Sequence, residues 1–356
     1  MVTYRIVHWG TGATGKLALG AVLDRVDYQL VGHYVVNPEK AGRDSGEIIG
    51  RAPVGVIATQ DLDALIALKP DVVTYFGNGV GNPVATAKDM ARFLEAGINV
   101  VTTSSSELIA RETATPEVLA IIDPACEKGQ SSIFASGVDP GFATSQLAIT
   151  CYSAAHRIDR VRLQEFADYG VYPDEPTGRH FFGFGLALDA VTPVSSGVLL
   201  RRMWMGTLNE NAKALGLEIE DYRTTHKAAP AARDYDTAIG RIDKGSTSAI
   251  WFQLIGMVGG EEKIILEHIN WINVDDVPAE WPVPPKYRGD YSACAYRLVV
   301  EGDPDFDVEL QMRGDHEGLM ITALHAVNAI PLTVAAAPGI VNQAQLAPYG
   351  TGKLKG

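Results

Sequence analysis

A glycine-rich turn near the start of the chain has the composition of a phosphate-binding loop. It reads Gly-Thr-Gly-Ala-Thr-Gly, with glycine at the first, third and sixth positions. The first glycine permits a tight turn, the second has no Cβ to hold a pyrophosphate away from the backbone, and the third lets strand and helix pack closely. This spacing predicts a dinucleotide as ligand. The residues expected to bind it here are Gly10, Thr11, Gly12, Ala13, Thr14 and Gly15.

The segments on either side of this turn support its interpretation as a dinucleotide-binding motif. Residues 4–9 form an apolar run typical of a strand, and residues 13–26 carry apolar side chains at helical spacing. The N-terminus of that helix would face the phosphates. Strand, turn and helix together favour a dinucleotide site over the alternative of a glycine-rich turn without a ligand.

The end of the second predicted strand bears on which dinucleotide binds. An Asp or Glu about 20 residues after the glycines normally holds the ribose hydroxyls in NAD-dependent enzymes. This chain has Asn37 there, and the cations Lys40 and Arg43 follow. The missing acidic side chain and the two positive charges favour NADP. NAD remains possible, because Glu39 could serve the ribose and the two cations could be solvated loop charges.

A hydroxyl-rich segment after the fifth predicted strand supplies the candidate catalytic group. Residues 102–107 read Thr-Thr-Ser-Ser-Ser-Glu and lie where a nicotinamide would bind, so Thr103 and Ser104 can hold its carboxamide. Glu107 is the only carboxylate of the segment and suits general acid–base chemistry. The alternative is that Glu107 begins a solvent-exposed helix over residues 107–111. Gly77 and Asn78, which follow the preceding strand, are also expected at the cofactor.

The elements that would position these residues alternate between strand and helix over the first 140 residues. Such alternation predicts an α/β, Rossmann-type, doubly wound parallel sheet, with ligands bound beyond the carboxyl ends of its strands. We therefore expect a dinucleotide-binding domain over residues 1–140. The predicted strands are residues 29–36, 54–58, 71–76, 98–102 and 131–135, and the predicted helices are residues 61–68, 83–96 and 116–128.

After residue 141 long β-patterned stretches replace this alternation. Consecutive strands joined by turn-like sequences predict a mixed or antiparallel sheet rather than further βαβ units. We expect an α+β substrate and dimerisation domain over residues 141–315, then a C-terminal helix and tail over residues 316–356 that return to the first domain. Helices are expected at residues 142–155 and 195–215, and strands at residues 157–169, 237–242, 246–258, 263–274, 292–301 and 306–313.

The composition of the chain excludes some kinds of binding partner and bound group. The chain has 356 residues, 46% of them hydrophobic, and a net charge of −13, which argues against nucleic acid or an anionic membrane as partner. Three cysteines without a CxxC pair, and no His/Asp cluster at ligand spacing, predict neither a disulfide framework nor a metal site. The first strand begins too close to Met1 for a signal peptide, so a cytoplasmic location is expected.

Short motifs in the later chain resemble a known family. Residues 137–142 read Gly-Val-Asp-Pro-Gly-Phe, and with residues 327–331, residues 338–340 and the glycine turn they resemble the 2,4-diaminopentanoate dehydrogenases and the related native amine dehydrogenases. These share the dihydrodipicolinate reductase type of two-domain fold. The resemblance covers most of the chain except about residues 170–230, and it departs from the family pattern at Asp139, where Asn is usual. The paired-histidine and lysine signature of true dihydrodipicolinate reductases is missing around Arg179 and His180.

The resemblance implies NAD(P)-dependent oxidative deamination of amines, or reductive amination of ketones and aldehydes with ammonia in the reverse direction. Glu107 matches the family's glutamate, which would activate water against an imine or deprotonate ammonium. Asn328, in the second motif, is expected at the cofactor. The expected wall of the substrate pocket consists of Phe142, Thr144, Tyr169, Tyr172 and His180, although ordinary core, surface or loop roles would also explain these residues.

Three functions stay open at this point. The leading hypothesis is an NADP-preferring amine dehydrogenase, acting on small amines as a homodimer. The second is a 2,4-diaminopentanoate dehydrogenase or another imine or semialdehyde oxidoreductase of the same fold, and the third is a non-catalytic dinucleotide-binding sensor. A substrate with a carboxylate would need a pocket arginine, for which the candidates are Arg157, Arg160, Arg162 and Arg179.

Overall fold

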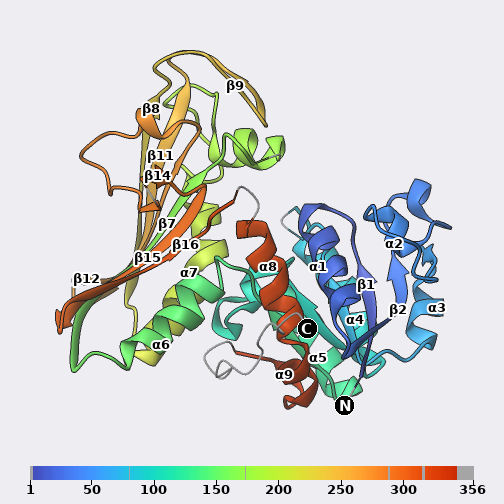
Figure 1. Cartoon of the computed structure of the whole chain (residues 1–356). Coiled ribbons are helices and arrows are strands. Elements are labelled where there is room, and N and C mark those ends of the chain that lie inside the picture. The colour runs from blue at the N-terminus through green and yellow to red at the C-terminus, as the bar shows by residue number, and fades with distance from the viewer. Residues whose placement is uncertain (1–2, 80, 173, 288, 315–316, 343–356) are drawn as a thin grey trace. The chain divides into compact units, whose positions relative to one another are not determined.

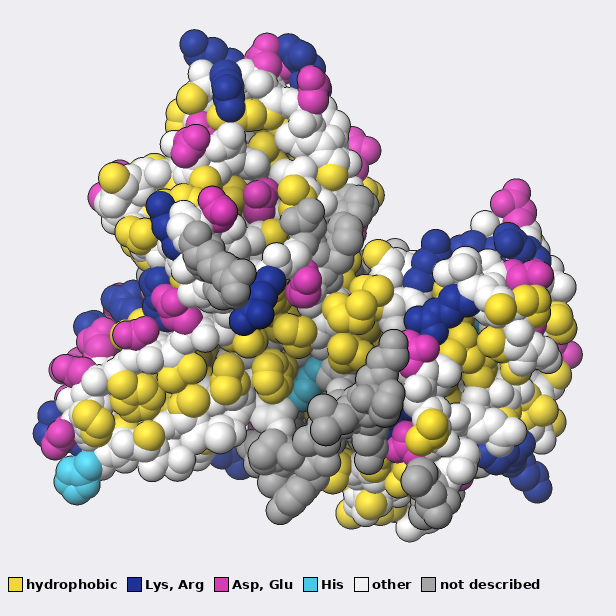
Figure 2. All heavy atoms as spheres, viewed as in Figure 1, with side chains coloured by type: hydrophobic (Ala, Val, Ile, Leu, Met, Phe, Trp, Pro, Cys, Tyr) yellow, Lys and Arg dark blue, Asp and Glu magenta, His cyan; other side chains and the backbone are white. Residues whose placement is uncertain are grey.

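The computed structural model describes residues 3–79, 81–172, 174–287, 289–314 and 317–342. The chain divides into two compact units: unit 1 combines the chain up to Phe142 with the C-terminal segment from Leu319, and unit 2 is Ala143–Gly318 (Figure 1). Figure 2 shows acidic and basic side chains interspersed on the face that it presents, rather than a continuous basic surface.

Unit 1 is built on a parallel sheet whose strands have the order β17-β6-β5-β4-β1-β2-β3. The chain steps outward from β1 in both directions, which is the doubly wound arrangement predicted for this region. Residues 54–58 were expected as a strand, but Gly55 has φ +78° and only the last residue of the segment joins the sheet. The strands are β1 (Tyr4–Trp9), β2 (Tyr28–Tyr34), β3 (Ala58–Thr59), β4 (Val72–Tyr75), β5 (Asn99–Thr102), β6 (Ser132–Ala135) and β17 (Gly339–Ile340).

Helices cover both faces of this sheet, because successive strand residues point to opposite sides. Val7 of β1 belongs to one apolar core with Met90 of α4, whereas its neighbour Ile6 belongs to another with Val22 of α1 and Ala326 of α8. The helices of unit 1 are α1 (Ala13–Asp24), α2 (Ser45–Ile48), α3 (Leu62–Ala67), α4 (Pro83–Glu95), α5 (Pro116–Gly129), α8 (Glu317–Asn328) and α9 (Ile330–Ala335).

The stretch Glu317–Ala335 is long and apolar enough to cross a membrane by composition, with a mean hydropathy of 1.5. It nevertheless consists of two helices, α8 and α9, separated at Ala329. Ala323, Val327 and Ile330 are fully buried in the same core as β1 and α1. A third of the 18-residue apolar window is buried in this way, so one side of the stretch packs into the core of unit 1.

Unit 2 is built on a six-stranded mixed sheet of order β16-β15-β7-β12-β11-β8, in which only the β7–β12 pair is parallel. Helices α6 and α7 share one apolar core with this sheet, and the predicted α+β class is confirmed. The main elements are α6 (Ala148–Tyr152), β7 (Arg157–Asp168), α7 (Val198–Ala214), β8 (Asp221–Pro230), β11 (Thr247–Val258), β12 (Glu261–Trp271), β15 (Cys294–Asp303) and β16 (Phe306–Gln311).

Three predictions for unit 2 need correction. Strand β8 escaped prediction because it is an edge strand whose side chains alternate between exposed and half-buried, with few apolar residues. The expected strand at residues 237–242 is a hairpin of β9 (Tyr235–Thr237) and β10 (Gly240–Ile242). The expected helix at residues 142–155 begins as a π-helical segment, Phe142–Leu147, before α6.

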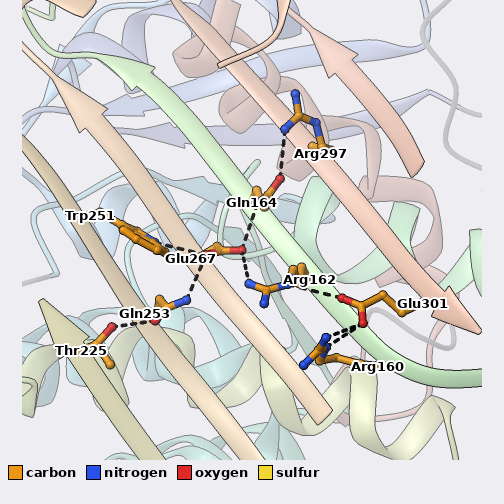
Figure 3. Close-up of polar contacts among 9 residues, drawn as sticks. All are labelled: Arg160, Arg162, Gln164, Thr225, Trp251, Gln253, Glu267, Arg297 and Glu301. Atoms are coloured by element: carbon orange, nitrogen blue, oxygen red, sulfur yellow. Dashed lines mark hydrogen bonds and ion pairs between the residues drawn. The ribbon is translucent and has the colours of Figure 1, made fainter. Parts of the chain in front are cut away.

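A buried carboxylate, Glu267, joins a network of polar side chains on one face of this sheet (Figure 3). Its neighbour Leu266 packs in the core with α7, so Glu267 points to the opposite face. The Glu267 side chain is 0% exposed, and its Oε1 accepts from Arg162 Nη1 at 3.0 Å and Gln164 Nε2 at 2.9 Å. Its Oε2 accepts from Trp251 Nε1 at 3.1 Å and Gln253 Nε2 at 3.0 Å. The strand register creates this network, because Glu267 of β12 pairs directly with Gln164 of β7 and Gln253 of β11.

Candidate active site

The glycine turn lies between β1 and α1, where the first parallel strand ends. Gly10 has φ +110°, and a Cβ there would lie 2.4 Å from the Phe76 carbonyl oxygen. A Cβ on Gly15 would lie 2.8 Å from the Gly10 carbonyl oxygen, so neither position accepts a side chain. Gly12 differs, because it is exposed and a Cβ there would meet nothing within 4 Å. The turn is closed toward the core and open on the side of Gly12.

The start of α1 suits an anion. Its N-cap is Gly12, which provides no side-chain cap, and its first turn has no acidic residue. The first amides of a helix have no intrahelical partner, so those of Ala13 and Thr14 can bind phosphate oxygens. The close approach permitted at Gly12 and these amides fit the pyrophosphate of a dinucleotide.

Lys40 reaches the glycine turn from the end of β2. Its Nζ donates to Thr11 Oγ1 at 2.7 Å. Asn37 instead caps its own short helix, Pro38–Lys40, by accepting from the Glu39 amide at 2.9 Å, and Arg43 is exposed on the following loop. Of the two cations expected at a 2′-phosphate, Lys40 is the one that contacts the turn.

The loops after β4 and β5 meet beside each other. Ser104 Oγ donates to the Gly77 carbonyl at 2.6 Å, and the Ser104 amide donates to Thr102 Oγ1 at 2.9 Å. Thr103 is half-buried and Asn78 is exposed. The structure thus joins Gly77 and Ser104 at the carboxyl ends of adjacent strands, where the cofactor was expected.

Glu107 is buried within unit 1. It lies in a short 3₁₀ helix, Ser106–Leu108, is 4% exposed, and its Oε2 accepts from the Thr115 amide at 3.0 Å where α5 begins. The alternative of a solvent-exposed helix over residues 107–111 is wrong, because the buried Leu108 and Ile109 draw the segment inward. The carboxylate is held in one orientation, and its catalytic role remains a prediction.

Asn328 lies near the amino ends of the parallel strands, the end of the sheet opposite the glycine turn. Its Oδ1 accepts from Arg25 Nη1 at 2.8 Å, and Tyr28, which begins β2, donates to the neighbouring Val327 carbonyl at 3.0 Å. These contacts surround the amino end of β2, whereas Gly10 follows the carboxyl end of β1. The expectation that Asn328 binds the cofactor is therefore corrected: Asn328 and Val327 join the end of α8 to Arg25 and to the start of β2.

In unit 2 the two predicted substrate-wall tyrosines belong to one aromatic cluster. The Tyr169 ring centroid lies 5.3 Å from that of Tyr172, 4.7 Å from Phe182 and 5.5 Å from Phe184. Burial raises the pKa of Tyr172 to about 12, so the phenol stays protonated at neutral pH. Phe182 and Phe184 are buried in the core of unit 2, and the half-buried Tyr169 and Tyr172 are the members that reach its surface, with their two hydroxyl groups.

The structure gives each of the other predicted wall residues contacts within its own unit or an exposed position there. Thr144 is buried and its carbonyl accepts from Asn211 Nδ2 at 2.9 Å. The half-buried Phe142 belongs to unit 1, where its ring centroid is 5.3 Å from that of His325. His180 is exposed on the π-helical segment Pro176–Phe182, and among the described residues no ring contact joins it to the tyrosines.

Sequence reasoning missed a buried polar cluster in unit 2. Glu165 Oε1 lies 3.0 Å from His268 Nδ1 and accepts from Asn270 Nδ2 at 3.1 Å, and Oε2 accepts from the Tyr296 hydroxyl at 2.8 Å. Burial by itself would raise the pKa of Glu165, but His268 and these hydrogen bonds outweigh it and lower the pKa. The available signal was a Glu at an inward position of β7, in line with the buried Val161 and Leu163.

Each arginine considered for a substrate carboxylate has a carboxylate partner within unit 2. The N···O separations are 3.5 Å or less in every pair. The pairs are Arg157 with Asp159 at 3.0 Å, Arg160 with Glu301, Arg162 with Glu267 at 3.0 Å, and Arg179 with Glu175 at 3.5 Å.

Two buried histidines adjoin the glycine turn, with ring centroids 5.2 Å apart. Burial, reinforced by the neighbouring His33, lowers the pKa of His8 to about 3. Burial likewise lowers the pKa of His33 to about 4. Both rings are therefore neutral in the folded protein at neutral pH.

These two histidines predict a loss of stability in mild acid. Below a pH of about 6.5 the unfolded chain binds protons that the folded chain does not, so stability is full above this pH and falls as the pH approaches 4. Each histidine contributes a slope of up to about 1.4 kcal/mol per pH unit. Urea unfolding between pH 7 and pH 5 measures the slope. It should decrease in His33→Gln and stay unchanged in the control His156→Gln, whose ring is exposed; equal slopes in all three proteins would contradict the assignment.

Comparison with known proteins gives consistent results. Residues 147–350 match the family model described as the 2,4-diaminopentanoate dehydrogenase C-terminal domain. The chain is 34% identical to an amine dehydrogenase of Streptomyces virginiae, covering 94% of this chain and 93% of that one. It is 23% identical to the 2,4-diaminopentanoate dehydrogenase of Acetoanaerobium sticklandii, with 96% and 92% covered. The amine dehydrogenase structure from Mycobacterium smegmatis superposes with a TM-score of 0.77 at 20% identity, covering 98% of this chain and 97% of that one.

Proposed function

The chain belongs to the family of amine dehydrogenases related to 2,4-diaminopentanoate dehydrogenase, and on that premise we propose that it is an NADP-preferring enzyme for small apolar amines and their ketones. It is an oxidoreductase acting on amines, so the alternative of a non-catalytic sensor is set aside. A nicotinamide dinucleotide supplies the hydride transfer when bound. The observation that carries the assignment is the 34% identity over 94% of the chain.

Glu107 is the proposed acid–base residue. In the deaminating direction its carboxylate takes a proton from the water that attacks the imine carbon of the substrate. In the aminating direction it takes a proton from ammonium, so that the free nitrogen can attack the carbonyl carbon. The hydrogen bond from the Thr115 amide supports this role, because an acid–base group must be held in one orientation.

The proposed substrate class is amines without a carboxylate. The half-buried Tyr169 and Tyr172, which pack on the buried Phe182, would offer the substrate mostly apolar ring faces. The candidate arginines of unit 2 are paired with acidic residues, and this disfavours substrates such as 2,4-diaminopentanoate, which carries a carboxylate.

Substrate assays test the proposed function. We expect ammonium-dependent oxidation of NADPH with short ketones such as butanone, and much lower kcat/KM with keto acids of similar size. A preference for the keto acids would support the diaminopentanoate type of reaction instead. No ammonium-dependent oxidation with either group would overturn the assignment to amine chemistry.

Cofactor choice is tested at the two cations after β2. We expect Lys40→Ala to lower the ratio of NADP to NAD kcat/KM by roughly tenfold, because Lys40 contacts the glycine turn. Arg43→Ala should have a smaller effect, since Arg43 is exposed on the next loop. Lys88→Ala, an exposed cation on α4, is the matched control. If the ratio is unchanged even when Lys40→Ala and Arg43→Ala are combined, the two cations are ordinary surface charges without a role in cofactor choice.

We also propose that the enzyme is a cytoplasmic homodimer with small-molecule substrates and neither a nucleic-acid nor a membrane partner. The net charge of −13 and the interspersed charges of Figure 2 support the proposal that neither nucleic acid nor an anionic membrane is a partner. Light scattering after size-exclusion chromatography tests the oligomeric state, and a monomer at micromolar concentration would contradict it.

A further inference from the structure

His8 lies fully buried in β1 beneath the glycine turn. Its Nε2 is 2.7 Å from the Gly10 carbonyl oxygen, and its Nδ1 is 2.8 Å from Thr74 Oγ1 on the neighbouring strand β4. A carbonyl oxygen can only accept, so Nε2 must carry the proton, and Nδ1 of the neutral ring then accepts from the Thr74 hydroxyl. Both ring nitrogens are satisfied in one tautomer, which fixes the orientation of the imidazole.

Gly10 contacts both the start of α1 and the end of β2. Its carbonyl oxygen lies 2.8 Å from where a Gly15 Cβ would be, and the Gly10 amide donates to the Tyr34 carbonyl at 3.2 Å. In a planar trans peptide the carbonyl and the next N–H point in opposite directions. Holding the Gly10 carbonyl toward His8 therefore turns the Thr11 amide away from the core, toward the open side of the turn.

We propose that His8 is a positioning residue for the dinucleotide: through the Gly10 carbonyl it sets the peptide plane that presents the Thr11 amide and the start of α1 to the phosphates. This inference rests on the proposed dinucleotide binding. The inference goes beyond dinucleotide binding by assigning a role to a residue that precedes the glycine motif and is fully buried.

Two substitutions distinguish the hydrogen bond that His8 donates to Gly10 from the space that its ring fills in the core. His8→Phe keeps a buried ring but removes the donor, and His8→Gln keeps an N–H that can reach the carbonyl. We expect His8→Phe to raise the dissociation constant and KM for NADPH roughly tenfold, with kcat at saturating cofactor within about twofold of wild type. His8→Gln should recover most of the affinity. His226→Phe, at a half-buried histidine of β8 in unit 2, is the matched control and should bind NADPH as wild type does.

A measurement on the unaltered protein tests the same inference if His8→Phe does not fold. In ¹⁵N-histidine spectra we expect His8 as the Nε2–H tautomer, with its Nε2 resonance shifting when NADPH is added. Wild-type affinity in a folded His8→Phe, or an Nδ1–H tautomer of His8, would overturn the inference while leaving the proposed function intact. Wild-type protein that binds no dinucleotide would instead overturn the proposed function.

Discussion

Glu107→Gln should lower the rate of reductive amination by about 10²-fold or more while leaving the dissociation constant for NADPH nearly unchanged. The amide cannot accept a proton from ammonium, yet its oxygen can still accept from the Thr115 amide, so the start of α5 stays capped. Glu107→Ala would lose both functions and confound catalysis with stability. Initial rates of ammonium-dependent NADPH oxidation, with binding followed separately by fluorescence, distinguish the two effects.

The matched control for this substitution is Glu112→Gln. Glu112 lies five residues further along in the next short 3₁₀ helix, Arg111–Thr113, and is exposed. Its substitution should leave the rate within about twofold of wild type. Wild-type activity in Glu107→Gln would remove this carboxylate from the mechanism, and another group would then have to serve as the base.

Glu267→Ala should reduce the free energy of unfolding by about 3 kcal/mol or more. The substitution removes a fully buried carboxylate that accepts from four side chains. Gln164 is buried and would be left with an unsatisfied donor, which costs about 1–3 kcal/mol. Trp251 and Gln253 would lose the same acceptor, but they are half-buried and each adds less. Arg162 adds less, because it is 28% exposed and retains Glu301 at 3.5 Å. Urea unfolding followed by circular dichroism measures the loss.

The control is Glu301→Ala on the same face of the sheet. Glu301 pairs with Arg160 and, at 3.5 Å, with Arg162, and the three side chains are 36%, 37% and 28% exposed. Each of these partly exposed pairs should therefore contribute at most about 1 kcal/mol. Similar losses in the two variants would show that burial of Glu267 does not set the strength of its network. Because Glu267 lies on the face of the sheet opposite Phe182 and the rest of the aromatic cluster, the activity of the folded Glu267→Ala fraction should be retained.

Two consecutive residues of β12, Glu267 and His268, belong to two different buried polar clusters. The two residues are consecutive, so their side chains point to opposite faces of the sheet. Glu267 joins the network of Figure 3, whereas His268 joins Glu165 on the α7 side. A shift of register by one residue would exchange the two sides, and the buried hydrogen bonds of both networks therefore specify the register.

Local patterns in the sequence were enough to predict the features that depend on neighbouring residues. The glycine turn, the strand before it and the helix after it follow from spacing alone, and the structure explains each glycine by a close approach or an open side. The alternation of strand and helix predicted the parallel sheet, and consecutive strands predicted the mixed one. Family motifs also indicated amine chemistry, which the 34% identical relative supports.

Only the tertiary structure decided the contacts between distant segments. Asn328 follows Arg25 by 303 residues. No local pattern could show that this residue joins the end of α8 to the amino end of β2. The partners Glu165 and His268 are on different strands, as are His8 and Thr74. A sequence pattern shows which face a residue occupies, because that depends on the period of its own element. Which atom it meets there depends on strand order and register, which arise only when the whole sheet forms.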